Sequence, residues 1–130
     1  MKKQFTFFVN TKYQYYLCPE QISNMKIEYE KEYLRELYYD GKTTDKKHRY
    51  QPQVVNGYAK CVRTLIKAVR MEDLYLIKAL NYERLKGNKK GLSSLRINEQ
   101  YRLEFRETVN PNNIIEIELC SLTDITNHYK

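Results

Sequence analysis

Seven basic side chains lie within a short stretch of the chain, from Arg84 to Arg106. They are Arg84, Lys86, Lys89, Lys90, Arg96, Arg102 and Arg106. Only Glu99 and Glu104 oppose them there, so this stretch holds most of the net charge of +7 carried by the whole chain. Clustered cations bind phosphate groups and stabilise the negative charge that develops in phosphoryl chemistry. The stretch therefore predicts an anionic partner, with nucleic acid, a ribosome and an acidic protein as the candidates.

Alternating hydrophobicity predicts the face of the sheet on which the arginine side chains of this stretch lie. Successive side chains of a strand point to opposite faces of a sheet, and residues 94–97 and 101–106 alternate between polar and apolar types. We therefore expect the apolar side chains of both runs to face a core. The open face of the sheet is then expected to carry Arg96, Arg102, Glu104 and Arg106.

Two interpretations of this open face follow from the residues. In the first, Arg96 and Arg102 on adjacent strands bind phosphates with the help of a glycine-flanked basic loop that precedes them. The lysines of that loop are Lys86, Lys89 and Lys90. In the second, the surface is inert, and Arg102 or Arg106 pairs with a carboxylate across the sheet. The candidate carboxylates are Glu104, Glu116 and Glu118. The residues alone favour neither interpretation.

The remaining potential ligands are scattered along the chain. Cys18, Cys61 and Cys120 form no CxxC pair, and His48 and His128 are isolated. This spacing predicts neither a metal site nor any other cofactor, and it is typical of reduced thiols in the cytoplasm. We expect no membrane span, because no apolar run approaches the roughly 18 residues that a bilayer requires. The apolar start of the chain lacks the length and the cleavage site of an export signal.

The length of 130 residues suits a single domain. Alternation predicts a strand over residues 25–30, and helical spacing predicts a helix over 31–39 that Gly41 ends. Pro52 begins a long amphipathic helix that reaches about Arg70, and a short helix or irregular link follows to Leu80. Three further strands are expected over residues 92–98, 100–108 and 114–122. This order predicts an α+β fold, with two helices packed on one face of an antiparallel meander.

The stretch from Leu85 to Phe105 resembles the core signature of the HigB-type "killer" toxins of the RelE/ParE superfamily. Members have Leu-Lys-Gly, a charged loop, a glycine, a Ser-x-Arg-(Val/Ile)-Asn strand and then (Tyr/Trp)-Arg. The residues that match are Leu85, Lys86, Gly87, Gly91, Ser94, Arg96, Ile97, Asn98, Tyr101 and Arg102. The end of the chain, from Asp124 to Lys130, is similar to their termini, and the order of elements matches the RelE-like fold. The resemblance covers residues 25–130, so residues 1–24 are expected to be a weakly ordered N-terminal extension.

The resemblance implies an endoribonuclease that cleaves mRNA at the ribosome without a metal ion, by attack of the 2′-hydroxyl on the adjacent phosphate. It implies that Arg96 and Arg102 stabilise the phosphate, that His128 is an acid or base, and that Tyr129 stacks on a base or assists proton transfer. The side chains that orient the RNA backbone would be Lys86, Lys89, Lys90 and Arg106. Some members carry a catalytic histidine just before the Leu-Lys-Gly motif, where this chain has Glu83 and Arg84. The assignment of acid and base therefore stays open.

The resemblance also implies partners. A toxin of this kind is held inactive by a small helix-turn-helix antitoxin similar to HigA, and it acts on mRNA and the ribosome. Two other functions fit the same charge and the same order of elements. One is a ParE-like toxin that inhibits gyrase, and the other is a basic RNA- or ribosome-binding protein without catalytic activity.

Overall fold

The computed structural model describes residues 25–110 and 112–127. The expected N-terminal extension, together with His128 and Tyr129, lies outside the described residues. The elements in chain order are β1 (Lys26–Tyr29), α2 (Glu32–Asp40), the 3-10 turn η1 (Lys46–His48), α3 (Pro52–Lys67), α4 (Met71–Tyr75), η2 (Lys78–Leu80), β2 (Glu83–Arg84), η3 (Gly87–Lys89), β3 (Leu92–Arg96), β4 (Tyr101–Asn110) and β5 (Asn113–Asn127).

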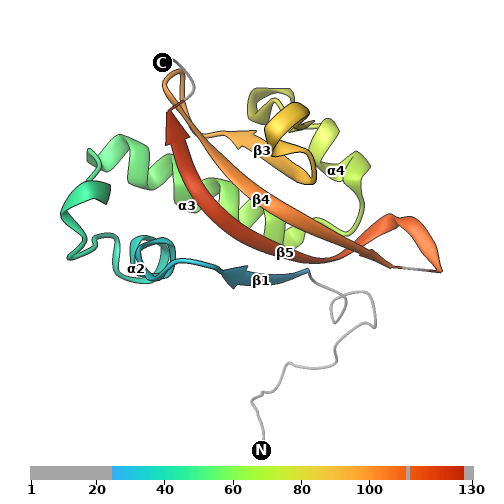
Figure 1. Ribbon diagram of the computed structural model, residues 1–130, viewed down its shortest axis with the longest axis horizontal. Coiled ribbons are helices and arrows are strands. Elements are labelled where there is room, and N and C mark those ends of the chain that lie inside the picture. Colours follow the sequence, from blue (N-terminus) through green and yellow to red (C-terminus); the bar gives the residue numbers. More distant parts are fainter. Residues whose placement is uncertain (1–24, 111, 128–130) are drawn as a thin grey trace, which may run out of the picture.

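The strands form one sheet in the order β1-β5-β4-β3-β2. The pairs β2–β3, β3–β4 and β4–β5 are antiparallel, as the sequence predicts, and β1 joins β5 in parallel. The helices α2 and α3 lie between β1 and the rest of the sheet in the chain, which allows β1 to run parallel to β5. Figure 1 shows α3 lying across one face of the sheet, behind β4 and β5. The α+β architecture expected from the sequence is therefore confirmed.

Both longer helices bury the apolar stripe that their sequence predicts. In α2 the buried side chains are Tyr33, Leu34 and Leu37, and in α3 they are Val54, Tyr58, Cys61, Val62 and Leu65. Gly41 ends α2 in the left-handed conformation, at φ 75°, with its N–H donating to the carbonyl of Leu37. The helix α3 ends at Lys67, earlier than expected, and the Asp73 carboxylate then accepts from the N–H groups of Val69 and Arg70.

One close approach fixes α3 against the sheet. A Cβ atom at Gly57 would lie 3.0 Å from both the carbonyl oxygen and a methyl carbon of Ile97. Only glycine therefore lets α3 lie this close to the turn between β3 and β4. Below the helix, the buried side chains of the sheet are Leu95, Leu103, Phe105, Cys120, Leu122 and Ile125.

The strand β5 extends to Asn127, beyond the expected end at Leu122. A register shift opposite Glu104 and Phe105 reverses the alternation, so that Leu122 and Ile125 are both buried although their numbers differ by three. The alternation of buried and exposed residues is therefore interrupted after Leu122, and a strand predicted from strict alternation ends at that residue.

Candidate functional site

Arg96 and Arg102 lie directly opposite each other on β3 and β4. The next pair along the same two strands, Leu95 and Leu103, is fully buried in the core. The two arginines therefore share the face of the sheet away from the helices, as the alternation predicts. Like charges directly opposite on neighbouring strands destabilise a sheet, so this arrangement calls for a compensating anion.

The two arginines line a polar cavity of about 110 Å³. Its lining residues are Asn81, Glu83, Ser94, Arg96, Asn98, Tyr101 and Arg102. Nη1 of Arg102 lies 3.0 Å from Oε2 of Glu83, whereas Nε of Arg102 is buried and has no hydrogen-bond partner among the described residues. An unsatisfied buried donor destabilises a fold by about 1–3 kcal/mol, and an anion in the cavity would satisfy it.

Arg96 is held less tightly than Arg102. Its side chain is exposed, and its Nε donates to the carbonyl of Asn98 at 3.4 Å. Beneath it, the buried thiol of Cys61 on α3 donates to the carbonyl of Arg96 at 3.5 Å. The backbone of β3 is thus fixed to α3, while the guanidinium group remains accessible at the cavity.

Glu83 is a site residue that the sequence analysis did not identify. It lies on β2, a strand of two residues, and pairs with Ser94 on β3, which places its carboxylate on the same face as the arginines. A two-residue strand is too short to show an alternation pattern, so periodicity cannot predict it. The available signal was its position two residues before Leu85, at the place where some members of the family that the sequence resembles carry a histidine.

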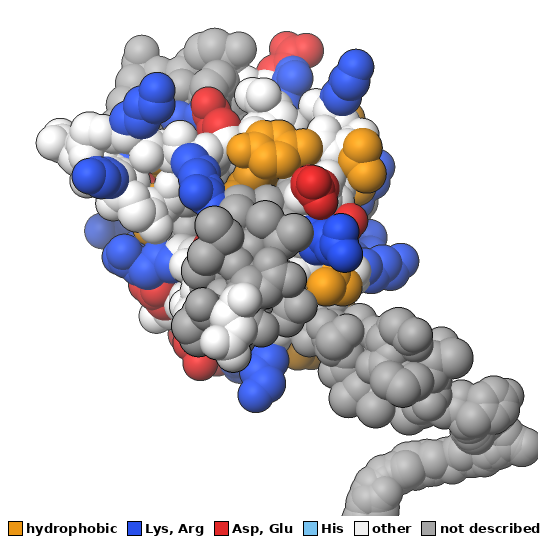
Figure 2. All heavy atoms as spheres, turned by 90° about the vertical axis from the view of Figure 1, so that its right-hand side faces the viewer, with side chains coloured by type: hydrophobic (Ala, Val, Ile, Leu, Met, Phe, Trp, Pro, Cys, Tyr) orange, Lys and Arg blue, Asp and Glu red, His pale blue; other side chains and the backbone are white. Residues whose placement is uncertain are grey.

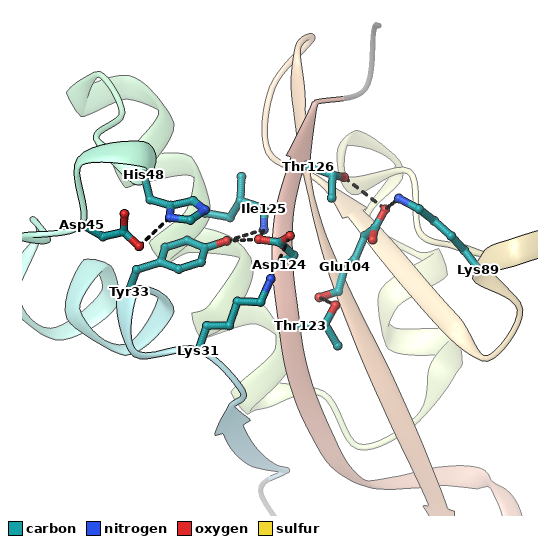
Figure 3. A network of polar contacts seen from close by, with 10 residues as sticks. All are labelled: Lys31, Tyr33, Asp45, His48, Lys89, Glu104, Thr123, Asp124, Ile125 and Thr126. Carbon is teal, nitrogen blue, oxygen red and sulfur yellow. Dashed lines mark hydrogen bonds and ion pairs between the residues drawn. The ribbon is translucent and has the colours of Figure 1, made fainter.

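Lys89 does not project freely from the glycine-flanked loop that precedes β3. Its ammonium group lies 2.6 Å from Oε2 of Glu104, and the Thr126 hydroxyl donates to the same oxygen at 3.1 Å (Figure 3). Glu104 points to the open face as expected, yet it is only 3% exposed, because η3 folds back and Lys89 reaches the carboxylate. The Lys89 ammonium is therefore used within the protein, and the phosphate contact expected of it competes with this pair.

The other cations of the stretch divide into two groups. Arg106 pairs with Glu30 at 3.4 Å, and Arg84 pairs with Glu107 at 3.5 Å. Lys86 and Lys90 are exposed, form no ion pair with any described residue, and border a second cavity of about 450 Å³ beside η3. Counting Lys89 and Arg102, carboxylates neutralise four of the seven cations. Arg102 and Arg106 thus pair with carboxylates, as the second interpretation expects. Their partners are Glu83 and Glu30, which differ from the carboxylates that it named.

An exposed apolar run lies on another part of the surface, at the end of α4. Tyr75, Leu76 and Ile77 are 55%, 78% and 42% exposed. Figure 2 shows the side of the molecule on which α4 lies in Figure 1, with hydrophobic side chains exposed among Lys and Arg. Contiguous exposed apolar side chains commonly mark surfaces that bind another protein.

Metal-binding clusters and membrane-spanning helices are both absent from the residues that the structure describes. Among them, no group of three His, Cys, Asp or Glu side chains is placed to hold a metal ion. None of their helices is long and apolar enough to cross a bilayer.

Sequence comparison gives two matches. Residues 27–119 match the family described as the RelE-like toxin of the type II toxin–antitoxin system HigB. Toxin HigB-1 of Vibrio cholerae serotype O1 is 35% identical over 83 residues, which cover 63% of this chain and 83% of that toxin. Both matches confirm the resemblance found in the stretch from Leu85 to Phe105.

Comparison of structures gives the same fold. The crystal structure of YafQ from E. coli strain BL21(DE3) has a TM-score of 0.52 and 15% sequence identity, over 80% of this chain and 93% of YafQ. The E. coli DinJ–YafQ toxin–antitoxin complex matches with a TM-score of 0.51 and 18% identity, over 81% and 93%. At this level of identity the likeness establishes the architecture, and the sequence matches carry the family.

Proposed function

This chain belongs to the HigB-like family, the RelE-like toxins of type II toxin–antitoxin systems, and we propose that it acts as an mRNA endoribonuclease. The observation that carries the proposal is the pair of opposed arginines at a polar cavity. Arg96 and Arg102 are paired across β3 and β4 and both line the cavity, and one buried donor of Arg102 lacks a partner among the described residues. A phosphate group of RNA supplies the anion that this pair requires.

The proposed reaction is a transesterification within the RNA strand. A base takes the proton of a ribose 2′-hydroxyl, the 2′-oxygen attacks the adjacent phosphorus, and the bond from phosphorus to the 5′-oxygen breaks. An acid protonates the leaving 5′-oxygen, so the products are a 2′,3′-cyclic phosphate and a 5′-hydroxyl end. Negative charge builds on the phosphate oxygens in between, and Arg96 and Arg102 stabilise it.

Glu83 is our candidate for the base. Its carboxylate lines the cavity and is held there by Arg102, within the reach of a hydroxyl group bound at the same arginines. His128 then remains as the candidate acid, with Tyr129 beside it in the chain. His128 and Tyr129 follow Asn127 of β5 in the chain. The partner of Asn127 on β4 is Tyr101, which lines the cavity.

The arginines supply the positive charge that a metal ion provides in other nucleases, so we expect cleavage without a metal ion bound to the toxin. Enough chelator to remove transition metals, with Mg²⁺ kept in excess to preserve the ribosome, should leave the rate unchanged. We place the reaction in the cytoplasm, on mRNA held by the ribosome. Lys86 and Lys90, which form no ion pair with a described residue, are then available to orient the RNA backbone.

The antitoxin is the second proposed partner, expected as a helix-turn-helix protein similar to HigA. The run Tyr75–Ile77 is the surface that we assign to it, because apolar side chains form the centre of protein interfaces. Lys78 follows this run and is also exposed, and the whole chain carries +7. A segment with apolar side chains and neighbouring carboxylates therefore fits this surface.

One experiment separates the three functions that remained open from the sequence. The chain is expressed from an inducible promoter, and the 5′ ends of cellular mRNA are mapped by primer extension. Discrete codon-linked ends that disappear with an Arg96→Ala/Arg102→Ala variant support the endoribonuclease. A DNA-damage response without mRNA cleavage indicates a gyrase inhibitor, and the absence of both indicates a basic RNA-binding protein.

A further inference from the structure

A second group of cations lies outside the site, in the loop of residues 42–49 between α2 and α3. We call residues 42–49 the basic loop. Its cations are Lys42, Lys46, Lys47 and Arg49, and its only carboxylate is Asp45. All four cations are exposed, and none of them forms an ion pair with another residue in the described part of the chain. The cations of the sheet, by contrast, are largely paired.

The basic loop is held in one conformation by its own polar side chains. Asp45 caps the turn η1, where its Oδ1 accepts from the N–H of Lys47 at 3.0 Å and its Oδ2 lies 2.9 Å from Nδ1 of His48. The Thr43 hydroxyl accepts from the N–H of Asp45 at 3.1 Å and donates to the Glu36 carboxylate on α2. The single carboxylate is thus used to shape the loop, and its ion-pair partner among the described residues is His48 and not a lysine.

The imidazole of His48 attaches the basic loop to the sheet. Its ring stacks on Tyr33 of α2, with 3.6 Å between ring centroids and 6° between planes. The Tyr33 hydroxyl accepts from the N–H of Ile125 at 2.8 Å and donates to the Asp124 carboxylate, which Lys31 contacts at 3.1 Å (Figure 3). The strand β1 pairs with β5 only as far as Leu122, so Tyr33 satisfies the backbone of β5 beyond that point. The loop is therefore anchored to the edge of β5.

We infer that the basic loop is a second RNA-binding surface, which binds the phosphate backbone of a folded RNA outside the strand that is cleaved. This inference rests on the proposed function for the identity of the polymer. A loop that is already fixed loses little conformational entropy on binding, and exposed cations without partners are the groups that displace counterions from RNA. Figure 3 shows the anchor of the loop and the Lys89–Glu104 pair on either side of β5.

The composition of the basic loop favours RNA over a protein partner. The centres of protein interfaces are apolar and poor in lysine. The large hydrophobic side chains that are most exposed among the described residues are Tyr39, Tyr75, Leu76 and Ile77, and none of them lies in the loop. A phosphate backbone requires only positive charge at fixed positions, which the loop supplies.

The test compares two triple variants with equal loss of charge. Lys46→Gln/Lys47→Gln/Arg49→Gln removes cations of the basic loop and keeps its anchors, Asp45 and His48. The control, Lys26→Gln/Arg63→Gln/Lys67→Gln, removes three exposed cations that form no ion pair with a described residue and lie outside the loop, the cavity and the run Tyr75–Ile77. Each variant is titrated against two RNA probes over a range of salt: intact bacterial ribosomes and a short single-stranded 2′-O-methyl RNA. Its affinity for the purified cognate antitoxin is measured as well. Thermal unfolding confirms that each variant is folded.

We expect the loop variant to bind ribosomes at least about 10-fold more weakly, with a salt slope smaller by about 2–3, since each lost contact removes roughly 0.7–0.9 from it. The control variant should keep the wild-type slope, and both variants should bind the single strand like the wild type. A Lys42→Gln/Lys46→Gln variant should change ribosome binding in the same direction.

Three results would overturn the inference. These are equal slopes for the loop variant and the control, an equal loss on the single strand, and a loss confined to antitoxin binding. The first would show a merely solvated surface, the second a contact with the substrate strand, and the third a protein surface. Neither probe requires cleavage, so a wild-type chain that binds ribosomes through the loop but leaves mRNA intact would contradict the proposed function and support this inference.

Discussion

The Glu83 carboxylate lies 3.0 Å from Nη1 of Arg102, across a cavity that both residues line. The strand β2 supplies the carboxylate and β4 supplies the guanidinium group, and β3 lies between the two strands in the sheet. The contact therefore exists only when both outer pairings of β3 are correctly registered. In the proposed reaction, a phosphate bound at Arg102 would share this guanidinium group with Glu83, and the carboxylate would then lie next to the reacting ribose.

Substitution Glu83→Gln keeps the size of the side chain and removes its ability to take a proton. If Glu83 is the base, cleavage of ribosome-bound mRNA should slow by about 10²–10⁴-fold, the usual contribution of a general base. Single-turnover rates across a pH series should also lose the rise that deprotonation of the base produces. Glu28→Gln, at an exposed position on β1, is the matched control. A rate at or above that of the wild type would mean that Glu83 only neutralises Arg102.

Substitution Lys89→Ala tests whether this lysine stabilises the fold. It leaves the buried Glu104 carboxylate with the Thr126 hydroxyl and without its cation. We expect the free energy of unfolding in urea to fall by about 1–3 kcal/mol. Lys86→Ala, at an exposed residue of the same loop, should change it by less than about 0.5 kcal/mol. Equal stability of the two variants, combined with weaker RNA binding by Lys89→Ala alone, would return Lys89 to the phosphate-binding set.

The buried thiol of Cys61 makes stability depend on alkaline pH. Burial raises the pKa of Cys61 from 9.0 to about 12, so the folded state favours the neutral thiol. The neutral thiol therefore makes its full contribution to the free energy of unfolding below about pH 9. As the pH rises from there towards 12, this contribution is lost at about 1.4 kcal/mol per pH unit. Burial also raises the pKa of Tyr50 to about 12, which adds to the loss above pH 10. Urea unfolding of the wild type and Cys61→Ala over this range should show their stabilities converging, and a constant difference would contradict the assignment.

The exposed run at the end of α4 predicts a separation of antitoxin binding from cleavage. Substitution Leu76→Asp places a charge at a side chain that is 78% exposed. We expect it to weaken binding of the cognate antitoxin by about 10-fold or more and to leave mRNA cleavage unchanged. Tyr39→Ser, at an apolar side chain that is 66% exposed on α2, is the control. Equal affinity of both variants for the antitoxin in calorimetry would place the antitoxin elsewhere.

Much of this fold was predictable because its signals are local. The spacing of apolar residues identifies the buried stripe of α3, Gly41 marks the end of α2, and alternation places Arg96 and Arg102 on one open face. Each of these features depends on residues that are close together in the chain. The resemblance to the HigB-type toxins rests on the same kind of local evidence, in the stretch from Leu85 to Phe105.

The features that the sequence analysis missed depend on contacts between distant residues. The strand β2 forms only because β3 presents a free edge, so the approach of Glu83 to Arg102 has no pattern of its own. The burial of Glu104 depends on η3 folding back over the sheet, although its position in an alternating strand was predicted correctly. The attachment of His48 to Tyr33 joins a loop to a helix, and a scattered histidine gives no sign of it.

The most direct test of the opposed arginines as the cleavage site is the rate of Arg102→Ala on ribosome-bound mRNA under single-turnover conditions. We expect a loss of about 10²-fold or more, the scale seen when one donor to a transition state is removed, with the thermal unfolding midpoint preserved. Arg35→Ala, at an exposed arginine of α2 paired with Glu32, should cleave at the wild-type rate. Cleavage by a folded Arg102→Ala variant at the wild-type rate would contradict the assignment of the open face as the active site.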